Sequence, residues 1–263
     1  MSALDALLRA APRSASVGDV DLAGDPDDPR VSLAWLLRMA ERTRDAAPAE
    51  VDPAQLAALE AQLADRPARD EELGQLHVDA ASCLRRAAHV RGHERVVAVG
   101  DDDGVTLALR LLGHREVCAL DLDERLLAFL AAEGVETHRA DFLEGSVPAA
   151  LRRRFTAAVT DPFRDLDGGL GFLCFAAACL APGGALYWVD DPLWNPEHGA
   201  VREAMARLGW HVVEAHLDVH AYPLSLASFD PSAIVEALGV ERAWIEALVT
   251  HTCAWSNLYR LAR

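Results

Sequence analysis

A short apolar segment, closed by a glycine and three acidic residues, constrains the fold more than any other part of the sequence. Residues 96–99 read Val-Val-Ala-Val, a run typical of a strand that is buried on both faces of a parallel sheet. Gly100 ends this run, carboxylates occupy positions 101–103, and an apolar helical pattern follows. We expect the acids at a strand-to-helix junction, the edge at which open α/β sheets bind ligands.

Asp101, Asp102 and Asp103 repel one another, so solubility alone does not explain three consecutive carboxylates, and we expect a cation to neutralise them. Acidic residues outnumber basic ones 41 to 25 over the chain, which gives a formal net charge of −16. Such a surface repels phosphate backbones and favours a small cationic partner over nucleic acid. Solubility explains most of the remaining carboxylates at least equally well.

Every one of the 25 basic residues is an arginine. Schiff-base enzymes and Walker P-loops both require a lysine amine, so both classes are excluded. The five cysteines are scattered and odd in number, which favours small buried side chains over a disulfide framework. The sequence has no secretory signal and no apolar run approaching about 18 residues, so we expect a cytoplasmic protein with no membrane segment.

From residue 95 onward, strand patterns alternate with helix patterns. The expected strands are 96–99, 116–120, 137–140, 157–160, 185–189 and 211–220; the expected helices are 105–112, 124–132, 168–180 and 201–208, preceded by helical patterns at 1–16, from 30, at 53–63 and at 79–90. This alternation predicts right-handed βαβ crossovers and an α/β fold with a doubly wound, Rossmann-like sheet. We expect a helical amino-terminal region over 1–90 and a Rossmann-like catalytic domain over 91–263.

Acidic residues also end the second and third expected strands. Asp121 lies about 20 residues past the glycine turn, where nucleotide-binding sheets hold the ribose hydroxyls. Asp123 points the same way from an extended backbone and competes for this role, and one of the two is expected to cap the following helix. We favour Asp121 for the ribose, and we expect Asp141 near the adenine of a bound nucleoside.

The phosphate-binding pattern Gly-x-Gly-x-x-Gly is absent, because the first turn has Gly100 and Gly104 with three acids between them. Such a turn repels a pyrophosphate and favours a cationic nucleoside. The expected donor co-substrate is therefore S-adenosylmethionine or its decarboxylated form, both of which are sulfonium ions.

Asp161, Pro162 and Phe163 close the fourth expected strand, where such folds present the group that handles the acceptor. Asp161 is suited to accept a hydrogen bond from an attacking amine, and Phe163 to pack on a cation, although Asp-Pro pairs also occur as plain turns. The same edge carries further acids suited to ammonium groups, and tryptophans that either line an acceptor pocket or only pack: Asp165, Asp167, Asp190, Asp191, Trp188 and Trp194.

His216, Asp218 and His220 alternate along one expected strand and would face the same side. These residue types suit a divalent metal, but exposed edge strands carry them without one, and we expect no metal site. The edge strand at 211–220 and the amino-terminal helices are candidate contacts in a homodimer.

The motifs at 97–103 (Val-Ala-Val-Gly-Asp-Asp-Asp), 121–127 (Asp-Leu-Asp-Glu-Arg-Leu-Leu) and 160–162 (Thr-Asp-Pro) resemble those of the branched-chain polyamine synthases, the bis(aminopropyl)spermidine synthases. The resemblance spans roughly residues 66–260. It implies transfer of an aminopropyl group from decarboxylated S-adenosylmethionine to an amine of a polyamine, with release of methylthioadenosine.

The resemblance also implies roles for individual residues. It makes Asp161 the catalytic aspartate, and it places Asp121 at the ribose, Asp141 on the adenine side and the acids at 101–103 at the amine end. Together with the positions of the residues at the sheet edge, this gives the full set of expected roles: Asp161 and Asp102 catalytic; Gly100, Asp101, Asp121, Asp141 and Pro162 in donor binding; Asp103, Phe163, Asp165, Asp190 and Trp188 in acceptor binding.

One position departs from the family pattern, which has Asp-Pro-Pro-Tyr where this chain has Asp161-Pro162-Phe163-Arg164. An arginine here would either bind a carboxylate, as in aminocarboxypropyl transfer from intact S-adenosylmethionine, or pair with Asp165 or Asp167, which we favour. The rival interpretations are a methyltransferase that acts on a small-molecule amine and a non-catalytic protein that binds polyamines or nucleosides.

Overall fold

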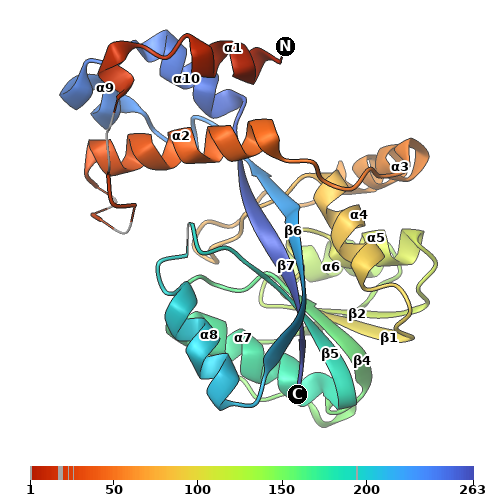
Figure 1. The fold of residues 1–263 in the computed structure, drawn as a ribbon. Coiled ribbons are helices and arrows are strands. Elements are labelled where there is room, and N and C mark those ends of the chain that lie inside the picture. Colours follow the sequence, from red (N-terminus) through yellow and green to blue (C-terminus); the bar gives the residue numbers. More distant parts are fainter. Residues whose placement is uncertain (1, 17–19, 23, 26, 194) are drawn as a thin grey trace. The chain divides into compact units, whose positions relative to one another are not determined.

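The computed structural model describes residues 2–16, 20–22, 24–25, 27–193 and 195–263 (Figure 1). Trp194 therefore lies outside the described residues. The chain forms two compact units, Met1–Ala47 with Ala221–Trp255 and Pro48–His220 with Ser256–Arg263. This division differs from the expected boundary at residue 90, because residues 48–90 cluster with the sheet and a carboxy-terminal segment clusters with the first helices.

The first unit is helical. It contains α1 (Ala3–Arg9), a 3-10 helix (Arg13–Ala15), α2 (Pro29–Asp45), α9 (Ser232–Leu238) and α10 (Arg242–Thr250). Pro29 opens α2 at its first position and the carboxylate of Asp28 caps it by accepting from the N–H of Arg30, at 2.8 Å. The unit is held together by a buried apolar cluster that includes Leu33 and Ile245, so residues far apart in sequence share one core.

The second unit contains most of the seven-stranded sheet. Its strands are β1 (Arg95–Val99), β2 (Glu116–Asp121), β3 (Glu136–Arg139), β4 (Phe155–Thr160), β5 (Leu180–Asp190), β6 (His211–Pro223) and β7 (Cys253–Ala262), in the order β3-β2-β1-β4-β5-β7-β6. Strands β1 to β5 pair in parallel, and β7 pairs antiparallel to β5. The predicted Rossmann-like α/β fold is confirmed.

The helices of the second unit are α3 (Pro53–Leu63), α4 (Ala80–His89), α5 (Val105–Leu111), α6 (Glu124–Ala132), α7 (Leu166–Cys179) and α8 (His198–Arg207). Their positions agree with the predicted ones within three residues at either end. Helix α3 packs against α4 and α5, and this contact explains why residues 48–90 belong with the sheet. Within the part of the chain that the structure describes, no helix is long and apolar enough to cross a membrane.

The sheet departs from the sequence prediction in β5 and β7. Strand β5 begins before the expected residue 185, because Leu180 already pairs with Phe155; Ala185 pairs with Ala157, and the residues between 180 and 185 loop out of the register. Strand β7, which follows α9 and α10, was not among the expected strands. It pairs with β5 and so continues the sheet beyond the parallel part.

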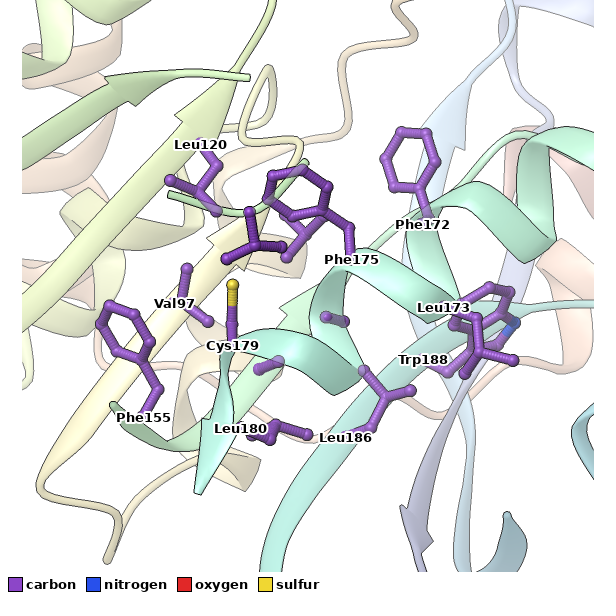
Figure 2. Packing of buried hydrophobic residues seen from close by; sticks show 14 of the residues in the cluster. Val97, Leu120, Phe155, Phe172, Leu173, Phe175, Cys179, Leu180, Leu186 and Trp188 are labelled. Atoms are coloured by element: carbon purple, nitrogen blue, oxygen red, sulfur yellow. The ribbon is translucent and has the colours of Figure 1, made fainter. Parts of the chain in front are cut away.

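One face of the sheet is covered by α7. Figure 2 shows Phe175 and Cys179 of this helix beside Val97, Leu120 and Leu186 of three strands, and all of these side chains are buried. Burial of a large apolar side chain stabilises the fold by about 1.5–3 kcal/mol. This packing fixes the positions of the strand ends that carry the acidic residues.

Candidate active site

A cavity of about 420 Å³ lies at the carboxyl ends of β1, β2 and β4. Gly100 follows β1, Asp121 ends β2 and Asp161 follows β4, and all three line the cavity. Strand β1 lies between β2 and β4, so the strand order reverses here, which is where open α/β sheets bind ligands. The structure thus brings Gly100, Asp121 and Asp161, which the sequence placed at one edge of the sheet, to one cavity.

Gly100 makes a sharp turn possible at the cavity. Its φ is +76°, in the left-handed region that favours glycine, and a Cβ atom at this position would come within 3.0 Å of the Phe172 ring. Phe172 also lines the cavity, and its ring contacts the Phe163 ring with centroids 5.4 Å apart. The glycine therefore lets the backbone pass close to an aromatic wall.

The Asp101 side chain does not line the cavity, contrary to the donor-binding role expected for it. Its carboxylate accepts hydrogen bonds from the N–H and the hydroxyl of Thr106, in the first turn of α5. Its backbone N–H donates to Asp121 Oδ2 at 3.1 Å. Burial raises the pKa of Asp101 to about 7. Asp101 therefore supports the turn and orients Asp121.

The Asp103 side chain also lies outside the cavity, where acceptor binding was expected of it. Its carboxylate accepts from Arg86 Nη2 at 2.9 Å and from the N–H of Val78 at 3.0 Å. Burial opposes its ionisation, but the charge of Arg86 outweighs burial and holds the pKa of Asp103 well below its ordinary value. The cation expected for the three acids is thus supplied in part by the protein itself.

Asp102 is the member of the three that lines the cavity. Its Oδ2 accepts from the N–H of Leu76 at 3.1 Å. Burial, followed by the negative charges of Asp103, Asp161 and Asp121, raises the pKa of Asp102 well above its ordinary value. A positive charge bound in the cavity would favour the ionised form of this carboxyl group.

Asp121 and Asp123 have separate roles, as the sequence suggested for one of the pair. Asp123 caps α6 by accepting from the N–H of Arg125 at 2.9 Å, and it pairs with the Arg125 guanidinium. Asp121 lines the cavity, and burial raises its pKa. Asp141 also lines the cavity, and its Oδ1 accepts from the N–H of Leu143 at 3.0 Å.

Asp161, Pro162, Phe163 and Arg164 all line the cavity. The ion pair of Arg164 in this structure joins its Nη2 to Asp161 Oδ1 at 3.3 Å, whereas the sequence favoured Asp165 or Asp167. The two residues are three apart on the turn after β4, so their side chains can meet. Near Phe163, a Cβ atom on Gly74 would come within 2.8 Å of the ring, so this glycine leaves room for it.

Besides Asp103, three more residues expected to bind the acceptor lie outside the cavity. Asp165 caps α7 by accepting from the N–H of Gly168 at 2.7 Å. Asp190 is buried and accepts from the Asn195 amide at 2.7 Å. Trp188 packs in the apolar core beside Leu173 (Figure 2). The sequence placed these residues at the correct edge of the sheet but could not tell which side chains point into the space.

Two residues beside the acidic turn were not predicted as part of the site. Arg86 is fully buried, and buried arginines are rare unless a carboxylate pairs with them. The sequence around Arg86 does not show that this residue is buried, so it gave no signal of the pairing. His220 lies with Asp103 and Asp161. The metal site considered above would instead need His220 to lie with His216 and Asp218. Asp218 has a φ of +52°, so the regular alternation along β6 is broken there.

Among the described residues, a second group of side chains of metal-binding type is Cys118, Glu136 and His138. Glu136 already forms an ion pair with Arg154 at 2.6 Å, which lowers its pKa to about 2. The positive charge of Arg154 opposes a second cation at this carboxylate.

Comparison with known proteins finds a family and several similar folds. Residues 56–189 match the family described as the branched-chain polyamine synthase A C-terminal domain. The branched-chain polyamine synthase from Thermus thermophilus, in complex with N4-aminopropylspermidine and 5'-methylthioadenosine, is 22% identical with a TM-score of 0.63, over 99% of this chain and 93% of that one. A mutein of the same synthase has a TM-score of 0.64 at the same identity and coverage.

A proposed RNA methyltransferase from Pyrococcus horikoshii is 14% identical with a TM-score of 0.52, over 80% of this chain and 98% of that one. No curated protein matches the chain. At these identities the likeness to solved structures is a likeness of fold.

Proposed function

The chain belongs to the branched-chain polyamine synthase family, and from this membership we propose that it transfers an aminopropyl group from decarboxylated S-adenosylmethionine to an amine of a polyamine. The observation that carries the proposal is the convergence of Asp102, Asp121 and Asp161 on one cavity of about 420 Å³. A cavity of this size fits a nucleoside with a short side chain. Its carboxylates suit a donor and an acceptor that are both cations.

In this proposal Asp121 binds the ribose hydroxyls, because it is a carboxylate at the end of the strand next to the glycine turn. Asp141 lies on the adenine side, and the aromatic wall of Phe163 and Phe172 packs against the donor. Asp102 faces the same space and offers its negative charge to the sulfonium or to an ammonium group. The donor supplies an electrophilic carbon next to its sulfonium sulfur.

Transfer requires one acceptor amine to be neutral. Its lone pair forms the new bond to the propyl carbon, the bond between carbon and sulfur breaks, and that electron pair stays on sulfur as methylthioadenosine leaves. We assign Asp161 to accept the hydrogen bond of this amine and the proton that it loses. Holding both reactants in line is itself a large part of such catalysis, since effective molarities reach about 10⁵–10⁸ M.

The test is incubation of the protein with either sulfonium donor and a set of linear polyamines, followed by mass analysis of the products. We expect methylthioadenosine and an acceptor enlarged by aminopropyl units, with the decarboxylated donor only. Adenosylhomocysteine would instead identify a methyltransferase. Binding of both compounds without turnover would identify a non-catalytic relative.

A second candidate function is aminocarboxypropyl transfer from intact S-adenosylmethionine. The observation in its favour is that Arg164 lines the cavity and carries a guanidinium, which suits a carboxylate. The ion pair of Arg164 with Asp161 favours the first function, because it already occupies the guanidinium. Products enlarged by aminocarboxypropyl units, and lost in Arg164→Gln, would favour the second.

A further inference from the structure

His220 connects the cavity to the buried ion pair behind it. The imidazole is fully buried, with Nδ1 at 3.6 Å from Asp161 Oδ2 and Nε2 at 3.4 Å from Asp103 Oδ2. Asp161 lines the cavity, whereas Asp103 is held by Arg86 and by the N–H of Val78. Pairwise contacts therefore connect the buried interior to the cavity, from Arg86 through Asp103 and His220 to Asp161.

The ion pair behind His220 favours one position for the ring proton, because Nε2 lies 3.4 Å from Asp103 Oδ2 and Nδ1 lies 3.6 Å from Asp161 Oδ2. The Asp103 carboxylate is ionised and can only accept, so it favours the tautomer with the proton on Nε2. The lone pair of Nδ1 then faces Asp161. Burial, followed by the charge of Arg86, lowers the pKa of His220, so the ring is neutral at pH 7.

We propose that His220 is a positioning residue, which orients Asp161 and receives through it the proton that the acceptor amine loses; this inference rests on the proposed aminopropyl transfer. The amine proton passes to Asp161, and from Asp161 to His220 Nδ1. Asp161 thereby regains its negative charge, while the imidazolium lies between two carboxylates. After the product leaves, the proton returns through Asp161, which reaches the cavity, to solvent. The Nδ1 to Asp161 distance has to shorten, as catalytic hydrogen bonds do when substrate binds.

The same side chains do not suit a metal ion equally well. Arg86 Nη2 and His220 Nε2 both approach Asp103 Oδ2, at 2.9 and 3.4 Å, so a cation would have to displace or repel a guanidinium. A proton relay leaves the guanidinium in place and needs only a shorter distance between His220 Nδ1 and Asp161. The groups facing the His220 ring with charge are Arg86 from α4, Asp103 from the turn after β1 and Asp161 from the turn after β4.

The test compares His220→Gln and His220→Asn with His216→Gln, which changes a histidine of the same strand that contacts Glu214 and stacks on His89 outside the cavity. We expect kcat to fall about 10- to 100-fold in both His220 variants, with KM for the donor within about twofold and the acidic limb of the kcat profile displaced. The control keeps the wild-type profile. A wild-type profile in both His220 variants, or a rate that a chelator abolishes in the wild type, would overturn the proposal.

A second measurement does not depend on turnover, and its main readout uses the wild-type protein. Nitrogen NMR of the wild-type histidine rings at pH 7 should find the His220 proton on Nε2, and Asp161→Asn should alter the Nδ1 signal. A proton on Nδ1 contradicts the relay. If no acceptor is aminopropylated but the tautomer is as expected, the proposed function fails while the arrangement of Asp103, His220 and Asp161 stands.

Discussion

The acidic turns after β1 and after β5 occupy equivalent places in the sheet but have different partners. At the end of β5, Asp190 is buried and accepts from His198 Nδ1 at 2.6 Å and from Asn195, and these hydrogen bonds outweigh burial and lower its pKa. After β1, Asp102 faces a cavity and its pKa is raised. Among the described residues, no side-chain cation forms an ion pair with Asp102.

The difference shows what turns an acidic strand end into a binding site. Internal partners complete the turn after β5, so it serves the fold. After β1, Arg86 neutralises Asp103, whereas Asp102 faces the cavity. Buried charges are tolerated only when they are paired, so the cavity-facing carboxyl groups favour a positively charged ligand.

The largest expected effect comes from comparing Asp161, which lines the cavity, with an acid that lies outside it. Asp161→Asn should retain binding of the donor but lower kcat about 10²- to 10⁴-fold, because the amide cannot take the proton. The matched control is Asp167→Asn, an exposed acid on α7 outside the cavity, which should keep the wild-type rate. Steady-state kinetics with the decarboxylated donor measures both. Equal rates in the two variants would remove Asp161 from the mechanism.

The variant Arg86→Met tests the buried ion pair that neutralises Asp103. This change leaves the Asp103 carboxylate buried without its partner guanidinium, and such losses cost about 3–5 kcal/mol of the free energy of unfolding. Urea unfolding at pH 7 measures the loss. The double variant Arg86→Met with Asp103→Asn removes the stranded charge and should recover part of it. A double variant less stable than the single one would mean that Arg86 acts through packing and not through its charge.

The cavity-facing side is tested by Asp102→Asn, through its pH dependence. The folded pKa of Asp102 is raised above 3.8, so the stability contributed by its protonated form is present below about pH 4 and lost as pH rises through the raised value. The amide variant lacks this loss and should be more stable than the wild type at pH 8, with the difference shrinking as pH falls toward 4. Asp101, with a pKa of about 7, also loses stability as pH rises, but it does so equally in the wild type and in the variant.

The same variant, which is expected to be more stable than the wild type at pH 8, is expected to bind cations more weakly than the wild type. A bound polyamine or sulfonium neutralises Asp102, so its removal should raise the dissociation constant about tenfold, or about 1.4 kcal/mol. Calorimetric titration with each cation measures this change. Unchanged affinity together with the gain in stability would place the cation elsewhere in the cavity.

The sequence predicted this sheet edge because strand periodicity and acidic strand ends are local signals. Helix α6 and its cap Asp123 follow directly from such signals. Local patterns do not encode two other features of the site. Asp103 pairs with Arg86, which is 17 residues away, and His220 reaches Asp103 from a strand far along the chain. For the same reason Trp188 was expected near the acceptor, whereas the packing of α7 on the sheet buries it in the core.

The smallest expected effect concerns Asp165, an acid at the same edge that serves the backbone. Its Oδ1 accepts from the N–H of Gly168 and caps α7, so Asp165→Ala should cost about 1 kcal/mol of stability. Transfer should continue at the wild-type rate, since the side chain lies outside the cavity. Asp165→Ser keeps a cap without the charge and should restore most of the stability. A loss of acceptor affinity in the serine variant would return Asp165 to the binding site, because only the charge would then explain it.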